Sequence, residues 1–565
     1  MKNIFTRLQK IAHFLSKPSV LLILLLVMAA FFRLVSLGNF SVGFDQVQIV
    51  SKANEIVKGD ISLIGPRTGP ANMFTGPLIY YITAPFVYLG GNFMAIIFVP
   101  ALLSLITGTT LFLLTRRYLG NQQAILVTAF WAFSPFIVSL DRIFWNPNLM
   151  LLSTLLVFIP LLLSEKQKPD KFVYIALLTG SFLAYQAHFS GFLLVLLVIF
   201  SIVLFKLPKR LIFMVGLGQL VSLLPTLVFD LRNNWLNVRG FLALVSERGV
   251  ENVFSRFSDI FHNAYILIET FGKVMFFGSP TQTILVAGSI GLGLSLVCIK
   301  NTRLRSLLIF WLVAIAVLYS FYRGAKPEYY FLIAVVPFLF VLSDLVSQMG
   351  KKYQWLILVF FFANSAATNF AKYQENSGMT VGNIQEIHSF LETQQVQSIT
   401  YDLPYGTDFG ISYLLEDIPL NEEGESFHIS FPHNFTFRGL TKISDVGVWA
   451  DQRSSENNYV SRNAYFIQTE KSIFVLKNDY PQVAVAPSDQ YEILKNNQVV
   501  GHLSIAESKN DQLEWVAVCR QWDEGRTAIW TNTSSGVYLT HYAGHCFQLK
   551  LDNPQQITAN EISIF

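Results

Sequence analysis

Four polar residues within the stretch "NFSVGFDQVQIVSKANEIV", residues 39–57, recur at the spacing of one helical face. They are Asp45, Gln48, Lys52 and Glu55, and steps of three, four and three residues place them on one side of a helix. A carboxylate there can accept a proton, or it can stabilise the positive end of the helix, because Asp45 falls in the first turn. Spacing leaves both roles open for Asp45. For Lys52 and Glu55 we prefer a solvated face.

The elements that must position these residues are membrane helices. The chain has 565 residues, of which 52% are hydrophobic and 14% are charged, whereas soluble proteins carry roughly a quarter charged residues. Spanning helices need about 20 largely apolar residues, and their repetition along the chain excludes a cleaved signal peptide as the explanation. Eleven spans are predicted, near residues 19–38, 92–115, 121–140, 148–164, 171–187, 189–205, 211–229, 282–299, 306–322, 329–346 and 354–370.

Basic residues in alternate short loops predict the orientation, because such loops stay on the cytoplasmic side. The N-terminus is then cytoplasmic, and everything after Asn369 is extracytoplasmic. The short basic inner loops favour the plasma membrane as the location of this multi-pass protein. The basic residues are Lys2, Arg7, Lys10, Lys17, Arg116, Arg117, Lys166, Lys168, Lys171, Lys206, Lys209, Arg210, Lys300, Arg303, Arg305, Lys351 and Lys352.

The composition divides the chain into a membrane domain, residues 1–370, and a soluble extracytoplasmic domain, residues 371–565. In the tail, "QSITYDLPYGTDFGISYLLEDIP" predicts a buried strand, a loop and a helix, the start of an α/β unit. Short β-branched and aromatic runs follow from "SIFVLKNDY" onward and predict antiparallel strands. The fold class is therefore a polytopic α-helical membrane protein with a C-terminal α+β domain.

The three cysteines form no metal-binding or redox motif, and no P-loop or GxGxxG pattern occurs. Cys298 lies at the inner end of a predicted span. Cys519 and Cys546 lie in the exported tail, where a disulfide can persist. A disulfide and two buried thiols both remain open for this pair. No nucleic-acid partner is expected.

Two outer loops, residues 39–91 and 230–281, are long enough to carry chemistry. In the first, "GPANMFTGPLIYYITAPFVYLGG" is interrupted by Gly and Pro, which predicts a helix dipping into the membrane interface. Its Tyr80, Tyr81 and Tyr88 are then expected at headgroup depth.

Other outer residues have both a functional and a structural interpretation. His188, in "YQAHFSGF", sits at the outer turn of a tight helical hairpin, where it is either functional or a hydrogen-bonded packing residue. The second loop opens with Asp230, Arg232 and Asn233. It continues with the amphipathic stretch "SERGVENVFSRFSDIFHNAY", which could cover a lipid carrier. For the charged residues of this loop we prefer a solvated face.

Several stretches, taken in order over most of residues 18–370, resemble membrane glycosyltransferases of the GT-C superfamily. They are an acidic residue just past the first span, a surface helix, "GPLIYYITAPFVYLGG", a span ending in "TRRYLG", "SLDRIFWNPNL", and "RGAKPEYYFLIAVVPFLF". The nearest resemblance is to the branch of protein O-mannosyltransferases and the lipid A aminoarabinose transferase. The tail carries no signature of the family.

The resemblance implies a transferase that takes a sugar from a polyprenyl-phosphate carrier on the extracytoplasmic face and passes it to a lipid, glycan or protein. The first-loop aspartate is at the active centre of such enzymes, and Asp45 matches it. Inverting transfer to a hydroxyl needs a base there and cationic help for the leaving phosphate. Candidates for the phosphate are Arg67, Arg142, Arg323 and Lys326. Interfacial snorkelling is the alternative for each of them.

The chain departs from the family at positions that bind a divalent metal in some relatives. Gln46 follows Asp45 where relatives often have Glu, Thr75 precedes Gly76-Pro77 where relatives have an acidic residue or His, and Asn146 replaces an Asp. A metal-independent mechanism is therefore at least as well supported as one with a divalent cation. The charged oxygen donors in the first half are Asp45, Asp60 and Asp141.

Asp141 has a second interpretation as the local partner of Arg142, which we prefer, and it joins Asn146, His188, Tyr80 and Tyr81 as accessory candidates. A transporter or flippase of lipid-linked glycans is the alternative function. Such a protein should place charged residues inside its spans, and the apolar runs here are almost free of them.

Overall fold

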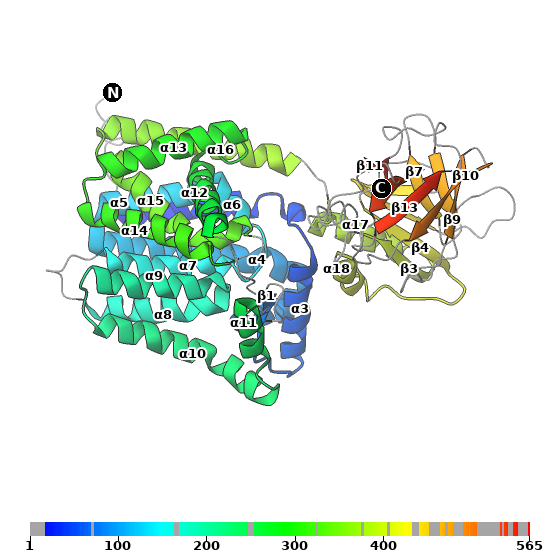
Figure 1. Ribbon diagram of the computed structural model, residues 1–565, viewed down its shortest axis with the longest axis horizontal. Coiled ribbons are helices and arrows are strands. Elements are labelled where there is room, and N and C mark those ends of the chain that lie inside the picture. Colours follow the sequence, from blue (N-terminus) through cyan, green and yellow to red (C-terminus); the bar gives the residue numbers. More distant parts are fainter. Residues whose placement is uncertain are drawn as a thin grey trace, which may run out of the picture. The chain divides into compact units, whose positions relative to one another are not determined.

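The computed structural model describes residues 17–68, 73–162, 169–246, 253–322, 326–374, 378–403, 407–431 and 440–450, and beyond them the strands β7–β14 (Figure 1). The chain divides into two compact units. The first comprises Met1–Phe40 and Gln48–Glu375, and the second comprises Ser41–Val47 and Asn376–Phe565.

The first unit is a bundle of apolar helices (Figure 1). Ten of the eleven predicted spans each coincide with one helix, and the span at 121–140 coincides with the pair α5 and α6. By length and composition six described helices can cross a membrane, or seven if the bent pair α5 and α6 is one span, and three further apolar helices are shorter. The count of eleven spans therefore stays a prediction. The helices are α2 (Pro18–Leu34), α4 (Leu78–Leu119), α5 (Asn121–Phe133), α6 (Pro135–Asp141), α7 (Asn148–Leu161), α8 (Lys171–Ala187), α9 (Ser190–Leu204), α10 (Arg210–Arg232), α12 (Val253–Phe276), α13 (Thr281–Cys298), α14 (Thr302–Tyr319), α15 (Leu332–Ser347) and α16 (Lys351–Gln374).

Two breaks interrupt the helices of the bundle. Pro135 pushes Ser134 into an extended conformation, as expected for a residue before proline, and α5 and α6 meet there at 64°. In α4 the helix is interrupted at Gly90 and Gly91, where Gly91 has φ +77°, a conformation that glycine adopts without strain. Residues 78–89 are therefore a separate helical segment before the predicted span at 92–115, as the Gly interruption predicts. Its position in the membrane interface stays a prediction.

The centre of the bundle is α7, all of whose residues from Asn148 to Leu161 are buried. It packs against α4, α8 and α15, and an all-round apolar helix is expected at such a position. Glycines allow other helices to approach closely. A Cβ on Gly288 of α13 would lie 2.1 Å from the carbonyl oxygen of Ile268 in α12, and small residues serve this purpose in membrane bundles.

The second unit contains two sheets. In the four-stranded sheet, of order β3-β4-β6-β5, β3 and β4 are parallel with α18 between them in sequence, as expected for an α/β unit. The eight-stranded sheet, of order β11-β12-β13-β10-β9-β8-β7-β14, is antiparallel throughout, as the runs after "SIFVLKNDY" predict. Cys519 and the side chain of Cys546 lie outside the described residues, so their disulfide stays a prediction.

The elements of the second unit have the following bounds: α17 (Val381–Glu392), β3 (Val396–Asp402), α18 (Thr407–Leu414), β4 (Glu425–Ser430), β5 (Leu440–Ile443), β6 (Val446–Ala450), β7 (Ala464–Gln468), β8 (Ile473–Lys477), β9 (Gln490–Lys495), β10 (Gln498–Ile505), β11 (Thr531–Thr533), β12 (Gly536–Thr540), β13 (Cys546–Leu551) and β14 (Ser563–Ile564).

Candidate functional site

The first outer loop begins with the helix that the spacing predicts, α3 (Phe44–Val57). Its apolar side is buried, with Val47, Val50 and Ala53 fully inaccessible. On the other side Lys52 and Glu55 form an ion pair of 2.6 Å with both side chains half exposed. The amphipathic helix is therefore confirmed, and its charged pair is solvated as expected.

Asp45 lies exposed in the first turn of α3. Desolvation by the surrounding protein raises the pKa of its carboxyl above the ordinary value. Among the described residues no hydrogen bond or ion pair to this carboxylate is present. Asp45 thus keeps the proton-accepting atoms that the predicted chemistry requires.

Gln46 explains one departure from the family pattern. Its side-chain oxygen accepts a hydrogen bond of 2.9 Å from the backbone N–H of Gly43, the residue before α3. A Gln three residues after the first capping position that reaches back in this way satisfies an unpaired donor at the helix start. Gln46 therefore caps the helix at the position where relatives often carry a second carboxylate.

The remainder of the loop is a short hairpin of β1 (Arg67–Thr68) and β2 (Met73–Phe74). Gly65 and Thr75 continue the pairing, with the N–H of Gly65 donating to the carbonyl oxygen of Thr75 at 2.7 Å. Arg67 and Asp60 are exposed, which leaves both accessible to solvent or ligand.

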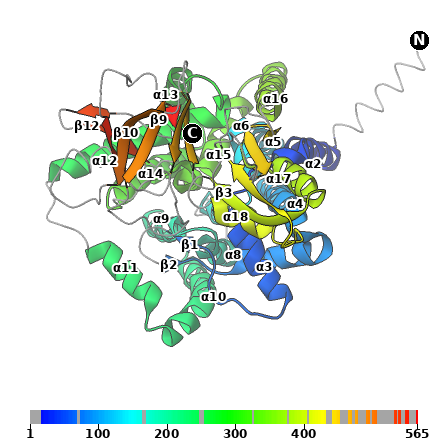
Figure 2. The ribbon, with the colours of Figure 1, turned by 90° about the vertical axis from the view of Figure 1, so that its right-hand side faces the viewer.

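The turn between α8 and α9 holds this hairpin in place (Figure 2). Gln186 accepts a hydrogen bond from the N–H of Leu78 at 3.0 Å and donates to the hydroxyl of Ser222 in α10. Tyr185 donates to the carbonyl oxygen of Phe74 at 2.9 Å. A Cβ on Gly76 would lie 2.1 Å from the side-chain amide of Gln186, so any larger residue there would displace this amide from its hydrogen bonds.

His188 joins the same turn to the entry of the tenth predicted span. Its Nδ1 accepts from the N–H of Ser190 at 3.1 Å. The ring lies edge-on to Tyr329 and Tyr330, with centroids 5.1 and 4.7 Å away. Burial lowers the pKa of His188, which keeps the imidazole neutral. The contacts support the packing interpretation of His188, and its functional role stays a prediction.

Asn146 and Trp145 complete this cluster from the turn between α6 and α7. Asn146 donates to the carbonyl oxygen of Ala187 at 2.5 Å, and Trp145 lies edge-on to Tyr329. The motifs "WNPN", "YQAHFSGF" and "KPEYYF" are thus brought together. The sequence had singled out all three without indicating that they meet.

Asp141 does not pair with Arg142, and the preferred interpretation from the sequence is wrong. The carboxylate is buried and bonds to the guanidinium of Arg33 in α2 at 2.8 Å and to the hydroxyl of Ser104 at 2.5 Å. Arg33 also lies over the ring of Trp131, 4.4 Å from its centroid. The apolar runs therefore contain a buried ion pair, and the charge inside the first of them was the signal for it.

Arg142 instead holds the end of α2. It donates to the carbonyl oxygens of Arg33, Val35 and Ser36 at 2.9, 2.6 and 3.0 Å, and its guanidinium lies over Phe40. A cation at the C-terminal end of a helix satisfies its last carbonyls. These contacts favour a positioning role, and the phosphate-binding role of Arg142 stays a prediction.

The tyrosines of α4 differ from one another. Tyr80 is buried at 2% exposure, so it cannot lie at headgroup depth against lipid as expected. Tyr81 is partly exposed and donates to the carbonyl oxygen of Ser62 at 2.8 Å, and Tyr88 is exposed. Only Tyr81 and Tyr88 remain candidates for contact with lipid headgroups.

The second outer loop also differs from expectation, because some of its charges are buried in the protein. Asp230 accepts hydrogen bonds from the N–H groups of Asn237 and Val238 at the start of α11 (Leu236–Ser246). Asn237 in turn accepts from the N–H of Phe74 at 2.7 Å, which ties this loop to the first. No sequence signal identifies such an amide.

At the other side of this loop Lys273 of α12 forms ion pairs with Glu269 and with Glu328, which precedes α15. Lys326 is half buried, and burial lowers its pKa, although Asp259 opposes the shift. Arg323 lies outside the described residues, so its predicted role was not tested.

A divalent cation finds no obvious set of ligands in the part of the chain that the structure describes. No three His, Cys, Asp or Glu side chains lie close enough together there to hold a metal ion. Asp141, one of the three predicted oxygen donors, is already bound by Arg33 and Ser104.

Comparisons with known proteins agree with this architecture. A family model described as dolichyl-phosphate-mannose-protein mannosyltransferase matches residues 74–229. The structure is similar to crystal structures of ArnT from Cupriavidus metallidurans. For ArnT bound to undecaprenyl phosphate the TM-score is 0.52 at 13% identity, covering 77% of this chain and 99% of ArnT. For the apo state the TM-score is 0.50 at 13% identity, covering 76% and 97%.

A search of curated proteins gives no match. At 13% identity the likeness to ArnT concerns the fold. The shared fold confirms the resemblance to GT-C glycosyltransferases that the sequence suggests.

Proposed function

Since this chain has the GT-C fold, we propose that it is a membrane glycosyltransferase that moves a sugar from a polyprenyl-phosphate carrier to an acceptor on the extracytoplasmic face. The acceptor is a lipid, a glycan or a protein. Two similarities support the carrier class: the matching family is described by its dolichyl-phosphate sugar, and the ArnT structure contains undecaprenyl phosphate. Both are isoprenoid phosphates.

The observation that carries the proposal is the state of Asp45. It is an exposed carboxylate in the first turn of α3, and no described residue forms an ion pair or hydrogen bond with it. Its pKa is raised by desolvation, and a base whose pKa approaches the working pH transfers protons more effectively. Asp45 is therefore assigned as the general base.

The proposed reaction inverts the anomeric carbon. The acceptor oxygen attacks this carbon from the side opposite the phosphate, while Asp45 takes the hydroxyl proton. The bond between the anomeric carbon and the phosphate oxygen breaks, and both of its electrons remain on the phosphate. The phosphate leaves on its lipid carrier, and a nearby cation stabilises its charge.

Two described cations are suited to that last task. Arg67 is exposed on the first-loop hairpin and offers two parallel N–H donors to a phosphate. Lys326 is half buried, and burial lowers its pKa because it disfavours the charged ammonium group. A phosphate beside Lys326 would stabilise this charged form. We propose both as phosphate-binding residues, together with Arg323.

The test is transfer by the purified protein in liposomes, with radiolabelled polyprenyl-phosphate sugars as donors and membrane extract as acceptor. Wild type is compared with Asp45→Asn, and Asp60→Asn serves as the matched control because Asp60 is an exposed aspartate of the same loop. Label should move from carrier to acceptor with wild type and Asp60→Asn, and stay on the carrier with Asp45→Asn.

Two other results would count against the proposal. Label that crosses the bilayer while still attached to its carrier identifies a flippase. Full turnover by Asp45→Asn leaves the transferase in place but removes Asp45 as the base.

A further inference from the structure

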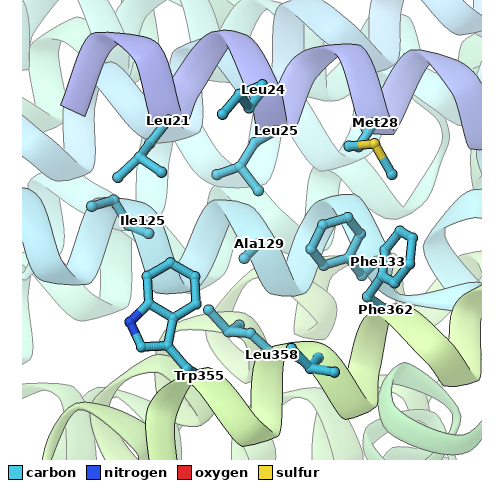
Figure 3. Close-up of a pocket in the computed structure, with 11 residues that line it drawn as sticks. Leu21, Leu24, Leu25, Met28, Ile125, Ala129, Phe133, Trp355, Leu358 and Phe362 are labelled. Carbon is cyan, nitrogen blue, oxygen red and sulfur yellow. The ribbon is translucent and has the colours of Figure 1, made fainter. Parts of the chain in front are cut away.

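An apolar groove of about 220 Å³ lies between α2, α5 and α16 (Figure 3). All of its lining side chains are apolar, apart from the indole nitrogen of Trp355. Ala129 lies near the middle of the lining, where its small side chain leaves room (Figure 3). The groove is far from the proposed chemistry, because it follows the first half of α2, whereas the first outer loop begins after the end of α2 at Leu34.

The groove is open to the outside of the bundle rather than enclosed. Leu24, Trp355 and Val359 line it and are 44%, 56% and 61% exposed. The outside of a spanning bundle is hydrocarbon. A lining without polar partners does not hold water, so its occupant is an apolar chain.

One end of the groove approaches the beginnings of all three helices. Leu21, Ile125 and Trp355 line this end, and Met28, Phe133 and Phe362 line the other (Figure 3). One helical turn before the first set, about 6 Å along the axes, α2, α5 and α16 begin. Gln122 of α5 donates to Gln354 of α16 at 3.2 Å and holds two of these beginnings together.

The same end is positively charged. Lys17 precedes α2, and Lys351 and Lys352 open α16; all three are exposed. The segments 17–22, 119–125 and 347–355, which surround this end, contain no Asp or Glu. Tyr353 and Trp355 are exposed beside the lysines, and aromatic side chains of this kind mark the boundary between hydrocarbon and headgroups.

We propose that the groove binds one chain of an anionic phospholipid, whose phosphate lies against Lys17, Lys351 and Lys352. The occupant is a lipid of the leaflet that faces the beginning of α2. The polyprenyl carrier is a poorer candidate, because under the proposed function its phosphate must meet the loop at the opposite end of α2, about 25 Å away along a helix of 17 residues.

Such a lipid fills the space between α16 and the two helices beside it, and α16 is the helix that leads to the second unit. Each lysine near an anionic headgroup contributes about a fivefold preference over a neutral one. The preference is therefore expected to be largely lost when Lys351 and Lys352 are both replaced.

The experiment uses brominated lipids, which quench the fluorescence of a tryptophan they touch. Wild type and Trp355→Phe are reconstituted with increasing fractions of dibromo-phosphatidylglycerol or dibromo-phosphatidylcholine, and the difference between the two proteins isolates Trp355. The difference signal should be half quenched at a severalfold lower fraction of the anionic lipid. Lys351→Ala/Lys352→Ala should reduce this preference, whereas the control Lys206→Ala/Lys209→Ala, at another basic loop, should not.

A second variant tests the groove itself. Leu24 lines the groove and is partly exposed, so the larger side chain of Leu24→Phe can occupy the groove without a clash in the buried core. This variant should weaken the quenching of Trp355 by both lipids. Leu294→Phe, on the exposed side of α13, is its control.

Three outcomes would overturn the proposal: equal quenching by both lipids, a preference that survives the lysine variant, or a preference abolished by added polyprenyl phosphate, which would assign the groove to the carrier. Because the readout is quenching, a failure of the transfer assay leaves this test unaffected.

Discussion

Asp45 lies in the first turn of α3 and Asp141 is the last residue of α6, yet the surroundings of the two carboxylates differ. Asp141 is buried, and Arg33 and Ser104 bond to its carboxylate. Asp45 is exposed, has no such partner among the described residues, and has a raised pKa. A carboxylate bound by a buried arginine is committed to structure, whereas one whose oxygens remain available can exchange a proton. We therefore expect Asp141 to contribute to stability and Asp45 to contribute to the reaction.

The largest expected effect is that of Asp45→Asn on transfer. Loss of a general base typically costs 10²–10⁴-fold in rate, so turnover should fall by about that factor while the unfolding midpoint changes little. Initial rates with a polyprenyl-phosphate sugar measure the first quantity, and thermal unfolding in detergent measures the second. If Asp45→Asn instead unfolds at a lower temperature, Asp45 stabilises the fold, as Asp141 does, and is not assigned as the base.

Asp141→Leu should destabilise the protein, because it leaves the guanidinium of Arg33 buried without its partner. Breaking a buried pair in this way costs about 3–5 kcal/mol, measured as the free energy of unfolding. The double variant Arg33→Met/Asp141→Leu removes both charges and should recover most of the loss. If the single variant is as stable as wild type, the ion pair does not hold α2 against α6.

Arg142→Gln distinguishes positioning from phosphate binding. Hydrogen bonds to a charged group contribute about 1.5–3 kcal/mol, and Arg142 makes three of them to carbonyls at the end of α2. We expect lower stability with little change in KM for the donor. A raised donor KM at unchanged stability would return Arg142 to the phosphate-binding set.

The pH dependence of transfer should report Asp45. The base acts only when it is deprotonated, so kcat/KM should rise with pH through the pKa of Asp45 and level off above it. Because desolvation by the surrounding protein raises this pKa, the rise should occur at higher pH than for an ordinary aspartate. Asp45→Glu should shift the rise without removing it. A profile that is unchanged in that variant would assign the rise to another group.

The smallest effect is expected at the exposed pair of α3. Lys52→Ala removes a solvated ion pair, and such pairs contribute about 0–1 kcal/mol. Both transfer and the unfolding midpoint should stay close to wild type. A large loss of transfer would extend the candidate site along the polar face of α3.

The printed residues alone predict which segments are helices and, for α3, which face is buried. Apolar runs coincide with the helices of the bundle, and the spacing around Asp45 predicts α3 with Val47, Val50 and Ala53 buried. The strand β3 and the helix α18 were equally visible as the start of an α/β unit, whereas β4 and its parallel pairing with β3 were not predicted. Periodicity carries this information because each element must bury one face, whatever covers it.

Which residues contact one another became clear from the packing of the helices. The partner of Asp141 is Arg33, 108 positions away, rather than the adjacent Arg142. The side-chain oxygen of Gln186 accepts a hydrogen bond from the backbone N–H of Leu78. The motifs "WNPN", "YQAHFSGF" and "KPEYYF" meet around His188 and Tyr329. Such contacts depend on how α2, α4, α6 and α8 pack together. A pattern along one helix specifies that a face is covered, but not which distant side chain covers it.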